Sequence, residues 1–136
     1  MGAINASPMG PVEDHLVQLR LDRRTGVAHL ELHDPQHFNA FSPGLGNSVL
    51  KAVVAIERMV AAQPSTIKAV LLTGKGKHFS VGGNPHQLKS VAKLSLPVLS
   101  LVLREVYNGF LKLSALPVPV VAAVHGSLVG LSLIHI

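Results

Sequence analysis

The sequence predicts an α/β fold in which a hairpin is followed by alternating helices and strands. Residues 16–21 and again residues 27–32 alternate between apolar and polar side chains, as strands with one buried face do. Two later apolar runs, at residues 67–73 and 119–124, are each preceded by a helical pattern. Strands separated by helices favour parallel pairing, and 48% apolar residues in a chain of 136 suffice for the core of one domain or part of one.

The first predicted element is the hairpin. Residues 1–14 are small, polar and proline-containing, so we expect a flexible N-terminal lead. Strands at residues 16–21 and 27–32 flank a turn at residues 23–26. The pair Asp34-Pro35 ends the second strand, because proline removes a backbone donor and restricts the residue before it.

Two helical regions follow. Ser42-Pro43 fits an N-cap with proline at the first helical position, and the apolar stripe behind it ends near Ala62. After the strand at 67–73, a helical pattern begins at Pro85, is interrupted at Pro97 and resumes to about Ser114. A stripe of apolar side chains in its second half is interpreted as core: Leu101, Leu103, Val106, Phe110 and Leu113.

The glycine-rich turn after the strand at 67–73 is the most informative feature. Gly82 and Gly83 allow close approach of a ligand, and their amides, at the start of the next helix, would face negative charge. A second glycine-bearing turn, at residues 126–130, is expected at the same edge of the sheet, where α/β proteins bind ligands. A tight strand-to-helix turn without a ligand fits the pattern of the first turn equally well.

Several function classes are excluded or disfavoured. The glycine spacing fits neither a P-loop nor a dinucleotide fingerprint. The charge of +5 is dispersed, so nucleic-acid binding is a weak interpretation and an anionic small ligand suits it at least as well. There are no cysteines, and His29, His33 and His37 lie on a broken strand, so no metal site is expected. Without a membrane-spanning run or a secretory signal, we expect a cytoplasmic protein with no membrane partner.

Three sequence blocks, at residues 27–42, 69–84 and 116–130, together resemble the enoyl-CoA hydratase/isomerase (crotonase) family. They match its strand with an Asn-Ala turn, its strand with Thr-Gly and Phe-x-x-Gly, and its Pro-Val-Ile-Ala-Ala-Val-x-Gly strand. The resemblance implies an incomplete crotonase-like (ClpP/crotonase) fold over residues 15–130, as an N-terminal fragment. It also implies an intact parent that assembles as a homotrimer or hexamer.

The resemblance also implies a site. The family binds the thioester carbonyl of an acyl-CoA with two backbone amides, which fall on Gly83 and on the residue after Gly130, here Leu131. No cofactor is implied, since acyl-CoA is the substrate. The positions that would contact substrate are Phe38, Ala40, Val81, Gly82, Asn84, His86 and Gly130. The default reaction is hydration of a 2-enoyl-CoA through a stabilised enolate.

The chain departs from the family at its end. The position of the first glutamate that acts as acid or base holds Ile134, and the second would lie beyond Ile136. Residues 131–136 are therefore expected to be a non-native tail, and the chain as written to be inactive. Two alternatives stay open. One is a dehydratase or decarboxylase of polyketide β-branching that acts on acyl-carrier-bound thioesters. The other is a non-catalytic half-domain that binds acyl-CoA or a partner chain.

Overall fold

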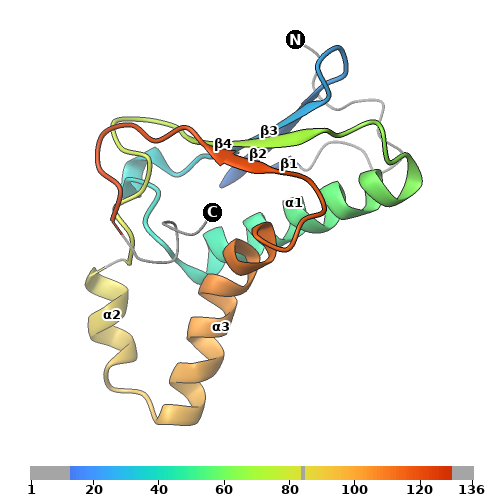
Figure 1. The fold of residues 1–136 in the computed structure, drawn as a ribbon. Coiled ribbons are helices and arrows are strands. Elements are labelled where there is room, and N and C mark those ends of the chain that lie inside the picture. Colours follow the sequence, from blue (N-terminus) through green and yellow to red (C-terminus); the bar gives the residue numbers. More distant parts are fainter. Residues whose placement is uncertain (1–12, 84, 130–136) are drawn as a thin grey trace.

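The computed structural model describes residues 13–83 and 85–129. Five strands form one sheet in the order β1-β2-β3-β4-β5, and helix α1 lies along one face of this sheet (Figure 1). The strands are β1 (Glu13–Asp14), β2 (Val17–Asp22), β3 (Val27–Leu32), β4 (Ala69–Gly74) and β5 (Val120–Ala122). The helices are the 3₁₀ turn η1 (Pro35–His37), α1 (Pro43–Ala62), α2 (Pro85–Val91) and α3 (Leu96–Leu113).

The pairing of the strands confirms the predicted α/β class. Strands β1, β2 and β3 are antiparallel neighbours, whereas β3, β4 and β5 pair in parallel. The turn between β2 and β3 is closed by Gly26, whose φ of 76° is accessible to glycine at little cost. Strand β1 was not predicted, since its two residues end the expected lead, and β5 is shorter than the predicted strand at 119–124.

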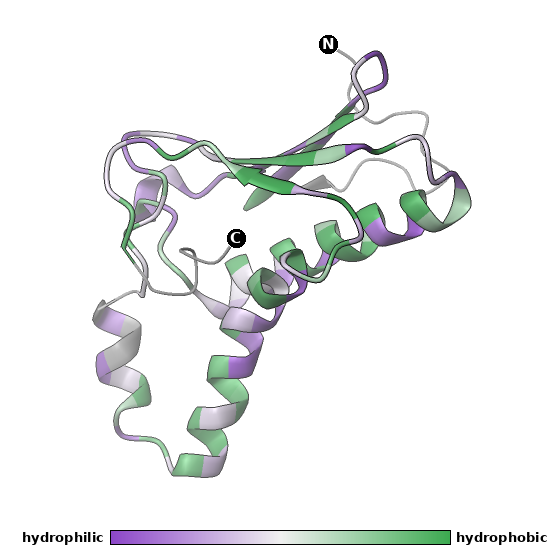
Figure 2. Ribbon diagram, viewed as in Figure 1, coloured by the Kyte–Doolittle hydropathy of each residue, from purple (hydrophilic) through white to green (hydrophobic). Residues whose placement is uncertain are grey.

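The core lies between the sheet and α1. Alternate residues of β2, β3 and β4 point toward the helix, as the full burial of Leu30 and Leu72 shows. From α1, Leu45, Val49 and Ile56 meet them at helical spacing. Figure 2 shows this hydrophobic band along the strands. Burying each such side chain contributes roughly 2 kcal/mol, so packing of the sheet on α1 dominates stability.

Helix α1 has the bounds that its sequence predicts. The hydroxyl of Ser42 accepts a hydrogen bond from the N–H of Leu45 (3.1 Å), and Pro43 occupies the first turn. At the other end the helix stops at Ala62, and Gln63 is extended. The capping signals are local, which is why sequence alone locates both ends.

The second helical region differs from its prediction. The break between α2 and α3 falls at residues 92–95, and Pro97 stands inside the first turn of α3. An N–H in the first turn has no partner within the helix, so proline is tolerated there; the predicted interruption exists, but it lies just before Pro97 and not at it. No helix in the described part of the chain is long and apolar enough to span a membrane.

The predicted core stripe of α3 is correct only in part. Val106, Phe110 and Leu113 are buried, but Leu101 is 61% exposed and Leu103 is 38% exposed. Helix α3 packs against α1 near its C-terminal end, while its first turns project away from the sheet together with α2 (Figure 1). The pattern of apolar residues predicts a helix, but it does not tell which of its turns find a partner.

The outer face of the sheet is polar around His29, on β3. The guanidinium of Arg20 donates to Nδ1 of His29 (3.2 Å), so the ring proton lies on Nε2, which donates to the hydroxyl of Thr73 (2.7 Å). Burial, and then the charge of Arg20, lowers the pKa of His29 below its ordinary value of 6.5, opposed by Glu31.

This environment predicts how stability depends on pH. Below pH 6.5 the unfolded chain binds a proton at His29 before the folded chain does, so the free energy of unfolding should fall as pH falls from 6.5 through the lowered folded pKa. Urea unfolding at about pH 5.5 and about pH 7.5 measures this change. The variant His29→Gln should lose less stability over the same interval. Equal losses in the two proteins would contradict the assignment.

Candidate functional site

The candidate site lies where three segments meet beyond the carboxyl ends of β3, β4 and β5. The first two segments are residues 38–41 and 79–83. The N–H of Val81 donates to the carbonyl of Phe38 (3.1 Å), and the N–H of Phe41 donates to the carbonyl of Gly82 (2.7 Å). These bonds extend the parallel pairing of β3 with β4 past the end of both strands.

The third segment, residues 125–129, pairs on the other side of residues 79–83. The N–H of Ser80 donates to the carbonyl of Ser127 (3.3 Å), and the N–H of Val129 donates to the carbonyl of Ser80 (3.0 Å). Within the described range the two glycine-bearing turns therefore lie side by side at one edge of the sheet, as the sequence predicts. This is the edge where parallel sheets offer open backbone groups to ligands.

Asn39 holds the first two segments together. It is fully buried and takes a left-handed φ of 54°, which asparagine tolerates better than most residues. Its side-chain oxygen accepts from the N–H of Asp34 (2.8 Å). Its Nδ2 lies within hydrogen-bond distance of the carbonyls of Lys75 (3.0 Å), His78 (3.1 Å) and Phe79 (3.0 Å). One side chain thus satisfies backbone groups on both sides of the junction.

Ser80 completes this arrangement and is also fully buried. Its hydroxyl donates to the carbonyl of Asn39 (2.8 Å) and accepts from the N–H of Gly82 (3.1 Å). The amide of Gly82 is therefore engaged within the turn, and the prediction that both glycine amides face a ligand is wrong for Gly82. With its hydroxyl donating to a carbonyl, Ser80 acts as a structural link between the segments.

The N–H of Gly83 is placed differently. Gly83 forms a parallel bridge with Phe41, and the N–H of Phe41 bonds to the carbonyl of the preceding residue, Gly82. In such a bridge the bonded groups flank the bridge residue, so the N–H of Gly83 points away from Phe41. Among the described residues no group accepts a hydrogen bond from it. It is the candidate donor that the turn presents.

The other predicted contact residues are spread around this turn. Phe38 is 47% exposed with a left-handed φ of 53°, whereas Ala40 is buried. Val81 is half-buried, and His86 is exposed on the seven-residue helix α2. The structure brings Phe38 and Val81 next to the Gly82–Gly83 turn. Three predicted positions lie outside the described residues: Asn84, Gly130 and Leu131.

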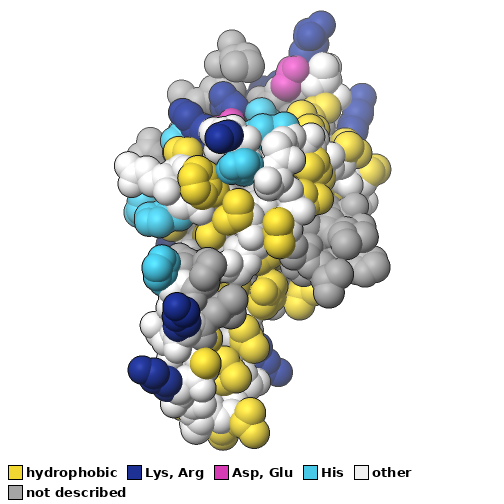
Figure 3. Space-filling model, turned by 90° about the vertical axis from the view of Figure 1, so that its left-hand side faces the viewer, with side chains coloured by type: hydrophobic (Ala, Val, Ile, Leu, Met, Phe, Trp, Pro, Cys, Tyr) yellow, Lys and Arg dark blue, Asp and Glu magenta, His cyan; other side chains and the backbone are white. Residues whose placement is uncertain are grey.

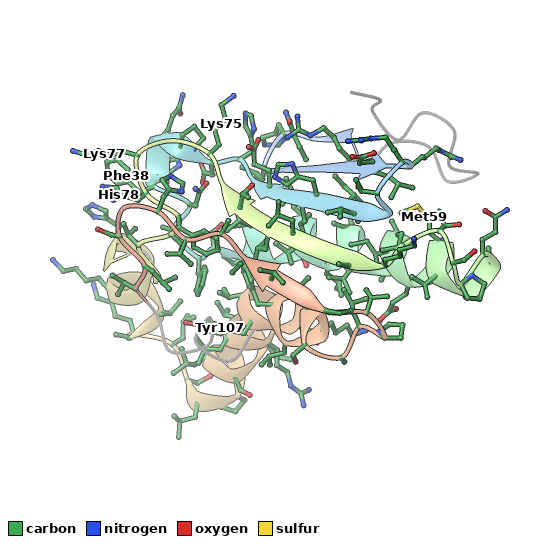
Figure 4. All side chains as sticks on the ribbon, turned by 45° about the horizontal axis from the view of Figure 1, so that its top comes forward. Phe38, Met59, Lys75, Lys77, His78 and Tyr107 are labelled. Atoms are coloured by element: carbon green, nitrogen blue, oxygen red, sulfur yellow. The ribbon has the colours of Figure 1, made fainter. Side chains whose placement is uncertain are left out.

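The end of the molecule that carries these loops is basic. Figure 4 shows Lys75, Lys77 and His78 on the loop after β4, with Phe38 of the segment after β3 beside them. Histidine side chains also lie on the face turned toward the viewer in Figure 3. Both lysines are exposed, so they add positive potential without a fixed partner geometry. Within the described residues no three histidine, aspartate or glutamate side chains come together in a way that could hold a metal ion.

Sequence reasoning did not assign Asn39 or Ser80 a role at this junction. Each bonds to a residue about forty positions away along the chain, as the contacts between Asn39 and Phe79 and between Ser80 and Asn39 show. Pattern and spacing report local structure and give no signal for such pairs. The Asn-Ala turn was visible as part of the first block, and that was the available hint for Asn39.

Comparisons with known proteins agree on one family. Residues 22–131 match the model of the family "Enoyl-CoA hydratase/isomerase". A protein of Thermus thermophilus described as an enoyl-CoA hydratase is 35% identical over 76% of this chain and 39% of its own length. The trans-2-decenoyl-[acyl-carrier-protein] isomerase of Streptococcus mutans is 33% identical over 77% of this chain and 38% of its own length.

The fold matches as well. A crystal structure of an enoyl-CoA hydratase from Mycobacterium smegmatis superposes with a TM-score of 0.67 at 30% identity, covering 83% of this chain and 41% of that one. The chain thus spans about two fifths of the length of the relatives it matches. With a family model matched over most of its residues and the crotonase fold in its sheet and helices, the chain belongs to the enoyl-CoA hydratase/isomerase family.

Proposed function

We propose that this chain supplies one half of an oxyanion hole for the carbonyl of an acyl thioester, with the N–H of Gly83 as donor. The observation that carries the proposal is the direction of that N–H, away from the Phe41 bridge and without an acceptor among the described residues. The donor sits on backbone fixed by Asn39 and Ser80, so little reorganisation is needed when charge develops.

The reaction that fits such a site best is hydration of a 2-enoyl-CoA. Addition of water at the β carbon passes through an enolate, whose negative oxygen would lie against the N–H of Gly83. Removing one donor of this kind typically costs about 3 kcal/mol of transition-state stabilisation. The second donor is proposed at Leu131, and no residue of this chain is proposed for the proton transfer.

Two carriers of the acyl thioester are considered, coenzyme A and an acyl carrier protein. The proposed substrate is an acyl-CoA, in keeping with the Thermus thermophilus relative. The Streptococcus mutans relative is named for an acyl-carrier-protein substrate, so a carrier-bound thioester is the second candidate. Both present the same carbonyl at the end of a phosphopantetheine arm. Binding of butyryl-CoA and of a butyryl-loaded carrier protein, measured in parallel, distinguishes them.

A pair of ligands tests the carbonyl contact directly. Butyryl-CoA is saturated and cannot be hydrated, and S-butyl-CoA is the same molecule without the carbonyl oxygen. A net hydrogen bond of about 1 kcal/mol predicts roughly fivefold tighter binding of butyryl-CoA by calorimetry. In Gly83→Pro, which removes this N–H, the preference for butyryl-CoA should fall by about this factor, to whatever the second proposed donor supplies.

Gly83→Ala is the matched control for this substitution, because it alters the same residue and keeps the donor. It should retain the preference for butyryl-CoA. Equal affinities of the wild-type chain for the two ligands would refute the oxyanion site. If both ligands bind tightly and with equal affinity, the result would support the alternative of a non-catalytic domain that binds acyl-CoA. If Gly83→Pro keeps the preference, another donor makes the contact.

A further inference from the structure

Two histidine side chains link the turn after β4 to the segment after β5. His78 belongs to the turn and His125 to the segment. Nδ1 of His78 accepts a hydrogen bond from the N–H of Ser127 (3.0 Å). In the other direction, Nε2 of His125 contacts the carbonyl of Gly76 (2.7 Å), to which it must donate. Each bond joins residues 49 positions apart, so neither follows from local turn geometry.

The geometry fixes the role of each ring nitrogen at His78. Because the N–H of Ser127 can only donate, Nδ1 of His78 must be unprotonated and the ring proton must lie on Nε2. A side chain without an acceptor at the Nδ1 position would leave the N–H of Ser127 unpaired. The bond therefore depends on this one nitrogen atom being free to accept.

His78 also contacts the first of the three segments. The ring of Phe38 meets it edge to face, with centroids 5.2 Å apart and an interplanar angle of 82°. On its other side the chain passes very close at Gly126, where φ is 59° and an added Cβ would lie 3.0 Å from Nδ1 of His78. His78 is thus the side chain at which residues 38–41, 79–83 and 125–129 meet.

We propose that His78 is a positioning residue that sets the spacing between the Gly83 turn and residues 125–129. The proposal rests on the oxyanion site proposed above, because that spacing determines how a thioester carbonyl approaches the N–H of Gly83. Backbone bonds of Phe79 and Ser80 tie the same segments, since the N–H of Phe79 donates to the carbonyl of His125 (2.9 Å) and Ser80 bonds to Ser127 and Val129. The contact of His78 with Ser127 adds a side-chain link beside these backbone bonds, and through Phe38 it also reaches the segment that pairs with the Gly83 turn.

Two substitutions separate the acceptor from the ring. His78→Asn keeps an acceptor oxygen near the position of Nδ1 and loses the ring, whereas His78→Phe keeps a ring against Phe38 and loses the acceptor. We expect hydrogen exchange of the Ser127 amide, followed by NMR, to be roughly fivefold faster in His78→Phe, the factor that loss of about 1 kcal/mol implies. Exchange in His78→Asn should stay close to that of the wild-type chain.

Ligand binding shows whether the contact positions the site or only stabilises the fold. His78→Phe should lose most of the preference for butyryl-CoA over S-butyl-CoA, and His78→Asn should restore it. If His78→Phe speeds Ser127 exchange and leaves the preference intact, the positioning role is refuted. If the two variants behave alike in exchange, the acceptor atom is irrelevant and the proposal also fails.

Two further measurements keep the proposal testable if a variant does not fold or a ligand does not bind. The ¹⁵N shifts of His78 in the wild-type chain should show the Nε2–H tautomer, and the Nδ1–H tautomer would refute the bond to Ser127. If the wild-type chain does not discriminate between the two ligands, the oxyanion proposal fails. The role of His78 in holding the segments together is then decided by Ser127 exchange alone.

Discussion

Replacement of Asn39 by alanine is expected to lower the free energy of unfolding by about 3 kcal/mol or more. The side chain is fully buried, and its loss strips a partner from the N–H of Asp34 and from the carbonyls of Lys75, His78 and Phe79. Leaving a buried backbone group without a partner costs about 1–3 kcal/mol, and alanine tolerates the left-handed φ of 54° less well than asparagine.

Two companion variants separate the causes. Asn39→Gly loses the same hydrogen bonds but accommodates the left-handed backbone, so it should recover about 1 kcal/mol relative to Asn39→Ala. Asn39→Asp keeps the acceptor for the N–H of Asp34 and places negative charge against three carbonyls, so it should be no more stable than Asn39→Gly. Urea unfolding measures all three. A loss below about 1 kcal/mol in Asn39→Ala would contradict the hydrogen-bond assignment.

Asn39→Ala should also weaken binding at the proposed carbonyl site. The hydroxyl of Ser80 donates to the backbone carbonyl of Asn39 and accepts from the N–H of Gly82. If the backbone of Asn39 moves, the hydroxyl of Ser80 must move with it, and this displaces the turn that contains Gly83. For this reason the preference for butyryl-CoA over S-butyl-CoA should weaken in Asn39→Ala even where the chain is still folded.

The elements whose signals are local could be predicted from sequence. The strand at residues 27–32 follows from the alternation of its side chains, and α1 follows from the Ser42 cap, Pro43 and the position of Gln63-Pro64. The meeting of the two glycine turns could also be predicted, because parallel strands place their carboxyl ends at one edge.

The remaining features depend on tertiary contacts. The exposure of Leu101 follows from the place where α3 leaves α1, and the engaged amide of Gly82 follows from the hydroxyl of Ser80. The bond between His78 and Ser127 joins two loops that are distant in sequence. None of these has a periodic pattern, and for that reason alternation and spacing could not reveal them.

A second large loss of stability is expected from a substitution at the crossing of α1 and α3. Gly46 and Gly109 let the two backbones approach closely: a Cβ on Gly46 would meet the carbonyl oxygen of Glu105, and one on Gly109 would lie 2.6 Å from the carbonyl oxygen of Gly46. Real Cβ atoms do not approach backbone atoms so closely, so the helices must move apart. Gly46→Ala should therefore lower the free energy of unfolding by about 2–3 kcal/mol.

The matched control is Gly44→Ala, two residues earlier on α1. There an added Cβ meets the flexible side chain of Leu16 at 3.3 Å and makes an ordinary contact with the hydroxyl of Ser42 at 3.9 Å. Alanine also favours a helix over glycine by about 1 kcal/mol. Gly44→Ala should be neutral or stabilising in urea unfolding. If Gly46→Ala and Gly44→Ala had the same free energy of unfolding, the two helices could move apart at no cost and the prediction would be wrong.

The crossing also bears on the site through Phe41. Its ring packs on Phe110 (centroids 4.6 Å apart) and on Tyr107 (5.7 Å), both on α3, while its N–H donates to the carbonyl of Gly82. A shift of α3 away from α1 would displace the ring of Phe41 and so disturb the bridge between Phe41 and Gly83. Gly46→Ala should therefore reduce the preference for butyryl-CoA, whereas Gly44→Ala should leave it unchanged. An unchanged preference in Gly46→Ala, at a lower free energy of unfolding, would show that the turn is held by Asn39 and Ser80 without help from α3.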